Sequence, residues 1–252
     1  MTITMPKPLP RAHAHNDYAH TRPLLDALEQ GFCSVEADVY LENGQLLVGH
    51  DKKDLRPERT LTALYLEPLW QRVKANGGQV YPDAAPVTLL VDIKTEGARV
   101  YAALKETLKP YAPMCTRFEN GKIQRRAITI ILSGDRPRDI LAAERNRLAA
   151  LDGRPDDLGK NLSVALIPLI SESWFTLFKW YGSGLMIRPD REKLSQLIEQ
   201  AHTEGRTIRF WATPDTPAGW EVCWRAGVDY LNTDKLSELA TFLRKRDNIR
   251  KD

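Results

Sequence analysis

The chain has 252 residues, of which 42% are hydrophobic and 27% are charged, a composition typical of a globular protein. The formal net charge of +3 at pH 7 is too small to indicate a nucleic-acid-binding protein, so we expect no nucleic-acid partner. The three cysteines are odd in number and lack metal-ligand spacing, which argues against a disulfide framework.

The N-terminal segment MTITMPKPLPRAHAHND contains no apolar run long enough for a signal peptide or a membrane span. We therefore predict a cytoplasmic protein without stable membrane insertion. A chain from which a leader had been removed would look the same, and it would be secreted or periplasmic. No internal repeat, low-complexity segment or linker divides the sequence, so we predict one domain over residues 1–252.

Short apolar, β-branched segments recur along the chain and alternate with helical patterns. The strands predicted from them span residues 9–15, 34–41, 87–94, 127–134, 162–169, 184–188, 207–213 and 228–234. Apolar residues with the i, i+3, i+4, i+7 spacing predict helices over residues 190–205 and 234–245. Eight strands that alternate with helices indicate an α/β fold, a single (β/α)₈ TIM barrel. An open doubly wound sheet is the main alternative, but no Gly-rich phosphate loop follows any strand.

The predicted strand SVEADVYL (34–41) carries two carboxylates on one face. Because side chains alternate along a strand, Glu36 and Asp38 point to one side and the apolar residues between them to the other. Two neighbouring carboxylates repel each other, and a buried pair of this kind needs a cation to neutralise it. Hard divalent cations such as Mg²⁺ and Ca²⁺ prefer oxygen ligands. The segment therefore predicts a metal site, against the simpler interpretation of a solvated face on an edge strand.

Further polar residues are expected at the carboxyl ends of the strands, where the active sites of such barrels lie. Asp92 alternates with Leu90 at the end of the third predicted strand, so it can point inward as a third carboxylate. His13 and His15 end the first strand, and His50 follows a short segment that returns the chain towards the carboxylates.

The other side chains expected at strand ends are Lys94, Ser133, Arg188, Trp211, Asn232 and Asp234. Three of them have simpler interpretations: Asp234 as a helix cap, Arg188 as a loop cation and Trp211 as a packing residue. The convergence of so many polar residues at one end of the barrel favours a functional site there.

At these residues the sequence resembles the glycerophosphodiester phosphodiesterase family, within the phosphatidylinositol-phospholipase-C-like phosphodiesterase superfamily. The similar motifs are HAHND (13–17), EAD (36–38) with HD (50–51), DIK (92–94), FWATPD (210–215) and GVDYLNTD (227–234). The first third, including RTLTALYLEPL (59–69), most resembles a less characterised branch that includes the fungal proteins called altered inheritance of mitochondria protein 6.

The resemblance implies a TIM barrel with one divalent metal ion, Mg²⁺ or Ca²⁺, and two catalytic histidines. Carried over to this sequence, Glu36, Asp38 and Asp92 would hold the metal, with Asp92 in place of the glutamate that is usual in the main branch. Lys94 would bind the phosphate.

The resemblance also implies that His50 and one of His13 or His15 are the general acid and base. We expect His15 and His50 to face each other across the metal, with Asn16 and Trp211 in contact with substrate. Two departures concern substrate binding more than the metal ligands: HAHND replaces the usual His-Arg-Gly, and the usual Glu-Asn-Thr motif is absent.

The implied activity is hydrolysis of a small-molecule phosphodiester. A metal and a lysine stabilise the negative charge that grows on the phosphate oxygens. One histidine deprotonates the attacking hydroxyl and the other protonates the leaving oxygen, and histidine suits both roles because its pKa lies near neutrality.

Two other functions remain open on the sequence. A zinc amidohydrolase-type barrel also begins with His-x-His, but it needs further histidines, and of those that remain His202 falls inside a predicted helix. The second is a non-catalytic barrel that binds a phosphorylated ligand. Release of alcohol from a generic phosphodiester with added divalent metal would separate an enzyme from such a barrel.

Overall fold

A nearly closed barrel of parallel strands forms the centre of the computed structural model, which describes residues 6–82 and 86–249. Its strands are β1 (Leu9–Ala14), β2 (Phe32–Glu42), β4 (Val87–Ile93), β7 (Ile128–Gly134), β9 (Ala149–Gly153), β10 (Leu169–Ser173), β11 (Thr207–Trp211) and β12 (Leu231–Thr233). They are hydrogen-bonded in the order β11-β10-β9-β7-β4-β2-β1-β12. The predicted (β/α)₈ fold is confirmed.

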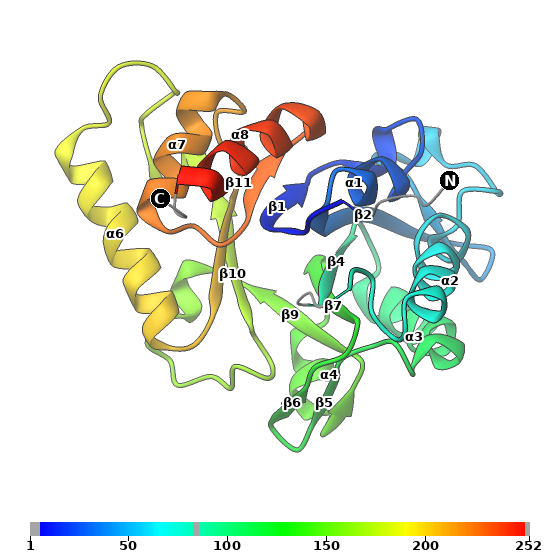
Figure 1. Cartoon of the computed structure of the whole chain (residues 1–252). Helices are drawn as coiled ribbons and strands as arrows, with labels where there is room; N and C mark the ends of the chain where they lie inside the picture. The colour runs from blue at the N-terminus through cyan, green and yellow to red at the C-terminus, as the bar shows by residue number, and fades with distance from the viewer. Residues whose placement is uncertain (1–5, 83–85, 250–252) are drawn as a thin grey trace.

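Helices connect the strands and cover the outside of the barrel, with α6, α7 and α8 along one side and α2 and α3 along another (Figure 1). The helices are α1 (Leu25–Glu29), α2 (Glu67–Ala75), α3 (Gly97–Leu108), α4 (Arg138–Ala143), α5 (Trp174–Leu177), α6 (Arg188–Thr203), α7 (Pro217–Ala226) and α8 (Leu236–Ile249). Thus the helices predicted over 190–205 and 234–245 are present as α6 and α8, with boundaries displaced by a few residues.

Smaller elements lie outside the barrel path. β3 (Gln45–Val48) pairs antiparallel with the end of β2, and a π-helical turn (Thr62–Leu66) leads into α2. The short strands β5 (Arg117–Glu119), β6 (Lys122–Gln124) and β8 (Asn146–Arg147) form a separate three-stranded sheet. The β2–β3 hairpin is what returns the chain from the carboxylates of β2 to His50.

The barrel closes where β11 meets the start of β12. Arg209 forms an isolated parallel bridge with Tyr230. The backbone N–H groups of Asp229 and Tyr230 both point to the carbonyl of Ile208, at N···O distances of 3.1 and 3.4 Å. The junction of β11 and β12 has fewer contacts than the other pairs of neighbouring strands in the barrel, and we call it the seam of the barrel.

β2 explains why the inward and outward faces of the barrel differ. Val35, Ala37 and Val39 are fully buried in the hydrophobic core on the outer face of the strand. Glu36 and Asp38 alternate with them and are also buried, at 6% and 1% exposure. Both faces of a parallel barrel strand are buried. A polar side chain on the inner face of β2 is therefore stable only if it has a hydrogen-bond or ionic partner inside the barrel.

Two of the eight predicted strands are wrong. Residues 162–169 resemble a strand because they are apolar, but Leu166 and Ile167 donate their backbone N–H groups to the carbonyl of Ser163 in a turn. The sixth strand, β10, begins only at Leu169. Of the segment 184–188, residues 184–187 lie in a loop before α6, and Leu185 in this loop is 91% exposed.

The true fifth strand, β9, has the sequence AALDG and was not predicted. Alanine and glycine have low β propensity, so the segment lacks the β-branched residues that identified the other strands. Arg188, expected at the end of a barrel strand, instead begins α6 and donates to Glu192 at 2.6 Å.

None of the helices formed by residues 6–82 and 86–249 is long and apolar enough to span a bilayer. The predicted domain also included residues 1–5, 83–85 and 250–252, which lie outside the described residues.

Candidate active site

The register of the sheet aligns four polar side chains inside the barrel. Asp38 of β2 pairs with Asp92 of β4, and Asp92 pairs with Ser133 of β7. The pairing of Leu132 with Leu151 brings the next residues, Ser133 and Asp152, level with each other. Asp38, Asp92, Ser133 and Asp152 therefore form an inner row that crosses four adjacent strands.

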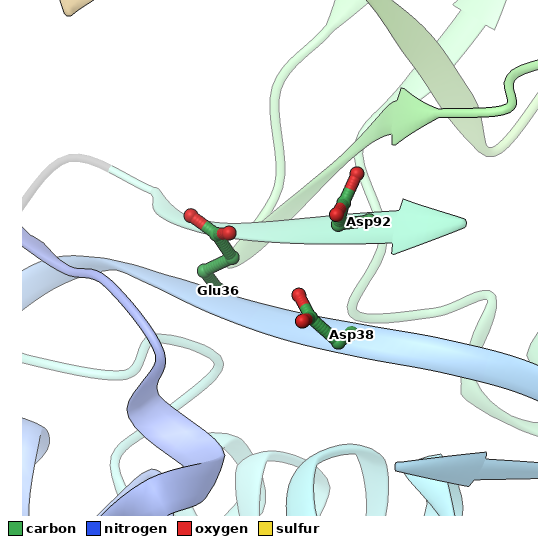
Figure 2. A group of neighbouring side chains, drawn as sticks. All are labelled: Glu36, Asp38 and Asp92. Carbon is green, nitrogen blue, oxygen red and sulfur yellow. The ribbon is translucent and has the colours of Figure 1, made fainter. Parts of the chain in front are cut away.

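The carboxylates predicted to hold a metal converge at one end of this row. Glu36, Asp38 and Asp92 each offer one oxygen, and these oxygens lie within 4.8 Å of one another. Figure 2 shows the three side chains, from β2 and β4, pointing to the same side of the sheet. The Oδ1 atom of Asp38 is buried and has no hydrogen-bond partner.

Lys94 lies against two of these carboxylates. Its Nζ atom is 2.7 Å from Asp38 Oδ2 and 2.6 Å from Asp92 Oδ2. Although burial opposes the charged amine, the carboxylates of Asp92 and Asp38 raise the pKa of Lys94. Burial raises the pKa of Asp92 against the effect of Lys94, and the neighbouring carboxylates of Asp38 and Glu36 add to that increase.

Arg209 of β11 neutralises Glu36 from across the barrel. Its Nη2 donates to Glu36 Oε2 at 2.7 Å and its Nε donates to Asn232 Oδ1 at 2.9 Å. Burial favours the protonated acid, but the Arg209 guanidinium and then His13 hold the pKa of Glu36 well below its usual range. Glu36 is therefore a carboxylate despite its burial.

These three residues fit a divalent cation. Their oxygens are hard ligands of the kind that Mg²⁺ and Ca²⁺ prefer. A cation placed among them would partner the buried Oδ1 atom of Asp38 and relieve the repulsion that raises the pKa of Asp92. Within the described part of the chain, this is the group that could hold a metal, and it contains no histidine. The zinc interpretation thus finds no support.

Gly134 makes room for Asp92. It has a φ of +67°, and a Cβ atom at this position would lie 2.2 Å from the carbonyl oxygen of Ile93 and 2.4 Å from Asp92 Oδ1. A side chain at position 134 would therefore collide with both the β4 backbone and the carboxylate. Glycine is required here by the position of a candidate metal ligand as well as by backbone conformation.

His15 and His50 each contact a different acidic side chain, and only His50 contacts one of the three candidate metal ligands. His15 Nδ1 lies 2.8 Å from Asp234 Oδ1, and this hydrogen bond raises the pKa of His15 in spite of its burial. His50 Nδ1 lies 3.1 Å from both Asp38 Oδ2 and the hydroxyl of Tyr18, and its side chain is 63% exposed.

His13 differs from the other two because both ring nitrogens are engaged inside the protein. Nδ1 is 2.7 Å from Ser34 Oγ, and Nε2 is 3.1 Å from Glu36 Oε2. Burial, followed by the charge of Arg209, lowers the pKa of His13 to about 3. His13 is thus a neutral, fully buried partner of Glu36.

A pocket of about 360 Å³ joins these groups at the carboxyl ends of the strands. It is lined by His15, Asn16, Glu36, His50, Leu90, Asp92, Lys94, Ser133, Gly134, Arg154, Arg209 and Trp211. Of the residues predicted to act in catalysis, substrate binding or metal binding, all but Asp38 and His13 line the pocket, and those two contact lining residues. Of the other side chains expected at strand ends, Ser133 lines the pocket, Asn232 bonds Arg209, and Arg188 lies outside it on α6. Asp234, expected at the end of the last strand with a helix cap as the simpler interpretation, bonds His15.

Four side chains in or beside the pocket were not predicted: Tyr18, Asp152, Arg154 and Arg209. Arg209 alternates with Trp211 on a correctly predicted strand, so its inward position was available from the sequence. Asp152 ends β9 and Arg154 follows it, and this strand was missed. The hydroxyl of Tyr18 lies 2.7 Å from Asp38 Oδ2, a contact that no sequence pattern indicates.

Comparison with known proteins agrees with this arrangement. Residues 5–152, more than half of the chain, match the model of the AIM6-like phosphodiesterase domain. The chain belongs to this family. Residues 207–237 match a second model, that of the glycerophosphoryl diester phosphodiesterase family.

Two curated relatives cover most of this AIM6-like chain. The altered inheritance of mitochondria protein 6 of Eremothecium gossypii is 32% identical over 93% of this chain and 69% of its own length. The homologue from Arthroderma benhamiae is 28% identical over 91% of this chain and 82% of its own length. The resemblance stated from the sequence is confirmed.

Among solved structures, a glycerophosphodiester phosphodiesterase from Parabacteroides distasonis superposes with a TM-score of 0.59. The superposition covers 96% of this chain and 99% of the other at 16% sequence identity. At this identity the likeness establishes the shared barrel fold.

Proposed function

We propose that this chain is a metal-dependent phosphodiester hydrolase that acts on a small-molecule diester, with Glu36, Asp38 and Asp92 as the metal ligands. The observation that carries the proposal is the buried, unpartnered Oδ1 atom of Asp38 among three converging carboxylates. We also infer that the barrel works as one domain. A bound divalent cation, Mg²⁺ or Ca²⁺, supplies positive charge to the phosphate oxygens.

Lys94 and the histidines supply the remaining chemistry. Lys94 stands at the pocket wall, where its ammonium group stabilises negative charge on the phosphate as the nucleophile adds. His50 acts as the general base and takes the proton from the attacking hydroxyl of the substrate's own glycerol while the new P–O bond forms. Water then opens the resulting cyclic phosphate by the reverse proton transfers, which completes the hydrolysis.

His15 acts as the general acid. The hydrogen bond that Nδ1 donates to the Asp234 carboxylate favours the protonated ring, which can give its Nε2 proton to the leaving alcohol oxygen as the old P–O bond breaks. His13 is unsuited to this role because both of its nitrogens are occupied, and we assign it to positioning Glu36. Asn16 and Trp211, which line the pocket, are assigned to substrate contact.

The test is release of alcohol from glycerophosphodiesters by the purified protein, first treated with chelator and then supplied with Mg²⁺, Ca²⁺ or Mn²⁺. We expect activity that chelator abolishes and one of these cations restores. Metal-independent hydrolysis would contradict the proposal. If a phosphorylated ligand binds but no diester is cleaved, the chain is a non-catalytic phospho-ligand-binding barrel.

A further inference from the structure

The wall of the pocket opposite the carboxylates carries an arginine that the proposed chemistry does not use. Arg154 follows β9, and its Nη1 donates to Asp152 Oδ2 at 2.9 Å and to the carbonyl of Gly153 at 2.8 Å. In the described contacts, Nε and Nη2 of Arg154 have no partner. The side chain lines the pocket and is 29% exposed. One edge of the guanidinium is thus fixed while the other edge remains available to a ligand.

Asp152 holds this guanidinium in place. Asp152 is fully buried, and its Oδ2 also accepts hydrogen bonds from Ser133 Oγ at 2.7 Å and Ser171 Oγ at 2.6 Å. The backbone N–H of Arg154 is held as well, by Asp157 Oδ2 at 2.8 Å. An arginine fixed at both backbone and side chain loses little entropy on binding an anion.

A second cation, Arg136, stands near Arg154 and forms no ion pair among the described residues, although the charges of Asp152 and Asp157 act on it. Arg136 donates Nη1 to the carbonyl of Gly134 at 3.0 Å, and its Nε is buried without a partner. Burial lowers the pKa of Arg136, and the charge of Arg154 lowers it further. Two guanidinium groups that repel each other next to a polar pocket indicate a site where negative charge is expected.

Arg154 stands away from the candidate metal ligands. Asp152 and Asp92 belong to the inner row but are separated by β7, and two strand spacings amount to about 10 Å. Lys94 and Arg209, by contrast, contact the candidate metal ligands directly. A group bound by Arg154 is therefore a part of the substrate that lies away from the reacting phosphate.

The charges in and around the pocket lead to the same conclusion. Four buried or half-buried carboxylates lie in or beside the pocket, and four cationic side chains balance them: Glu36, Asp38, Asp92 and Asp152 against Lys94, Arg136, Arg154 and Arg209. A divalent cation adds two positive charges, and a phosphodiester monoanion neutralises only one of them. A second anionic group on the substrate would neutralise the positive charge that remains.

We propose that Arg154, supported by Asp152 and Arg136, binds an anionic group on the alcohol of the substrate, so that the favoured diesters carry a second negative charge, a carboxylate or a phosphate. This inference rests on the proposed function, because it concerns the substrate of that same pocket. A bidentate, charge-assisted hydrogen bond between a guanidinium and a carboxylate or phosphate is the contact expected.

The test uses three diesters of glycerol 3-phosphate whose second alcohol is propanol, 3-hydroxypropanoate or 2-hydroxyethyl phosphate. We expect kcat/KM to be about 10- to 100-fold higher for the two anionic diesters than for the propanol diester. The ratio between those two distinguishes a carboxylate from a phosphate as the group recognised. Equal values for all three diesters in the wild-type protein would overturn the inference.

Calorimetric binding gives a readout that needs no turnover. Binding of the three diesters is measured with divalent metal present. The protein is the wild type if it cleaves no diester, and the His50→Ala variant if it does. We expect lower Kd values for the two anionic diesters than for the propanol diester. Absence of hydrolysis with an intact binding preference would overturn the proposed function alone. Hydrolysis with no preference would overturn this inference alone.

Variants of Arg154 and Asp152 test whether Arg154 causes the preference for anionic diesters. Arg154→Gln should bring the anionic-to-neutral ratio to within about threefold of one, and Arg154→Lys, which keeps a charge beside Asp152, should retain part of it. Asp152→Asn should reduce the ratio because the guanidinium is no longer fixed. Arg188→Gln, an exposed control on α6, should leave the ratio unchanged. An equal loss on all three diesters in Arg154→Gln would assign Arg154 to the reacting phosphate and overturn the inference.

Discussion

The two halves of the barrel mouth differ in how their charges are arranged. On β2 and β4, beside the histidines of β1, three carboxylates lie close together, and cationic side chains such as Lys94 neutralise them. On β7, β9 and β10, one buried carboxylate, Asp152, anchors a guanidinium whose other edge faces the pocket. The first half, which we call the acidic half, resembles a cation site. The second, which we call the cationic half, resembles an anion site. Together they favour one orientation of a bound substrate over the opposite one.

The largest expected effect tests the acidic half. Asp38→Asn removes a charge from the carboxylate whose Oδ1 has no partner. We expect hydrolysis of any diester to fall to the level measured with chelator, and divalent-metal binding measured by calorimetry to be lost. The thermal unfolding midpoint should show that the barrel remains folded. A variant that keeps metal-dependent turnover would show that Asp38 is not a ligand.

The next effect separates proton transfer from metal binding within the same half. Loss of one member of an acid–base pair typically lowers the rate by about 10²–10⁴-fold. We expect His50→Ala to lower kcat by that amount while metal affinity changes by less than about tenfold, because the side chain is 63% exposed and contacts Asp38 from outside. His20→Ala, at a half-buried histidine outside the pocket lining, is the matched control. Unchanged kcat in His50→Ala would refute the mechanism even with a correct metal site.

Arg209 neutralises the buried Glu36 from across the barrel, and its removal should destabilise the fold. Breaking a buried ion pair by removing one partner typically costs about 3–5 kcal/mol, because the other charge is left uncompensated. We expect Arg209→Met to lower the free energy of unfolding by about this amount, measured with urea in the absence of metal. The double variant Arg209→Met with Glu36→Gln should recover much of the loss. If it does not, Arg209 stabilises the seam and not Glu36.

The smallest effect concerns a buried acid beside the acidic half. Burial raises the pKa of Asp17 to about 7, above its ordinary value of 3.8, and its Oδ1 has no partner. Between these values the folded state holds a proton that the unfolded state has lost, so stability falls as pH rises through this window. The Asp17→Asn variant has no ionisable group at this position, so its stability does not fall with rising pH for this reason.

The measurement is the free energy of unfolding of Asp17→Asn and wild type at pH 5 and pH 8. Relative to wild type, we expect the variant to gain about 2–3 kcal/mol between these two pH values. Glu199→Gln, at an exposed position of α6, should show no such pH-dependent gain. Parallel pH curves for wild type and Asp17→Asn would mean that Asp17 is ionised in the folded protein.

The acidic half could be predicted because its information is local. Glu36 and Asp38 alternate with apolar residues in one strand, and Asp92 ends a strand of β-branched residues. The two-residue periodicity of a strand predicts which way such side chains point. The topology of the barrel predicts that they meet at the carboxyl ends of its strands. The predicted sites on these strands therefore lie in or beside one pocket.

The cationic half could not be predicted because its information is not local. Asp152 lies on a strand rich in alanine and glycine, and Arg154 follows that strand, which single-sequence patterns do not recognise. The apolar segment 162–169 matches the sequence pattern of a strand better than β9 does, but it forms a turn. Which histidine is engaged internally also depends on tertiary contacts, since His13 and His15 are two residues apart on one strand end yet differ in every partner.

Gly134 offers a way to sort related sequences. Its φ of +67° could be borne by another residue at a cost of about 1–2 kcal/mol. The contacts of its Cβ position, 2.2 Å to the carbonyl oxygen of Ile93 and 2.4 Å to Asp92 Oδ1, could not be accommodated unless the end of β4, which carries the carboxylate, moved. In an alignment, a side chain at this one column therefore marks a barrel whose third carboxylate has been displaced. Such a chain can keep every acidic residue of the motif and still have lost the arrangement that those residues make here.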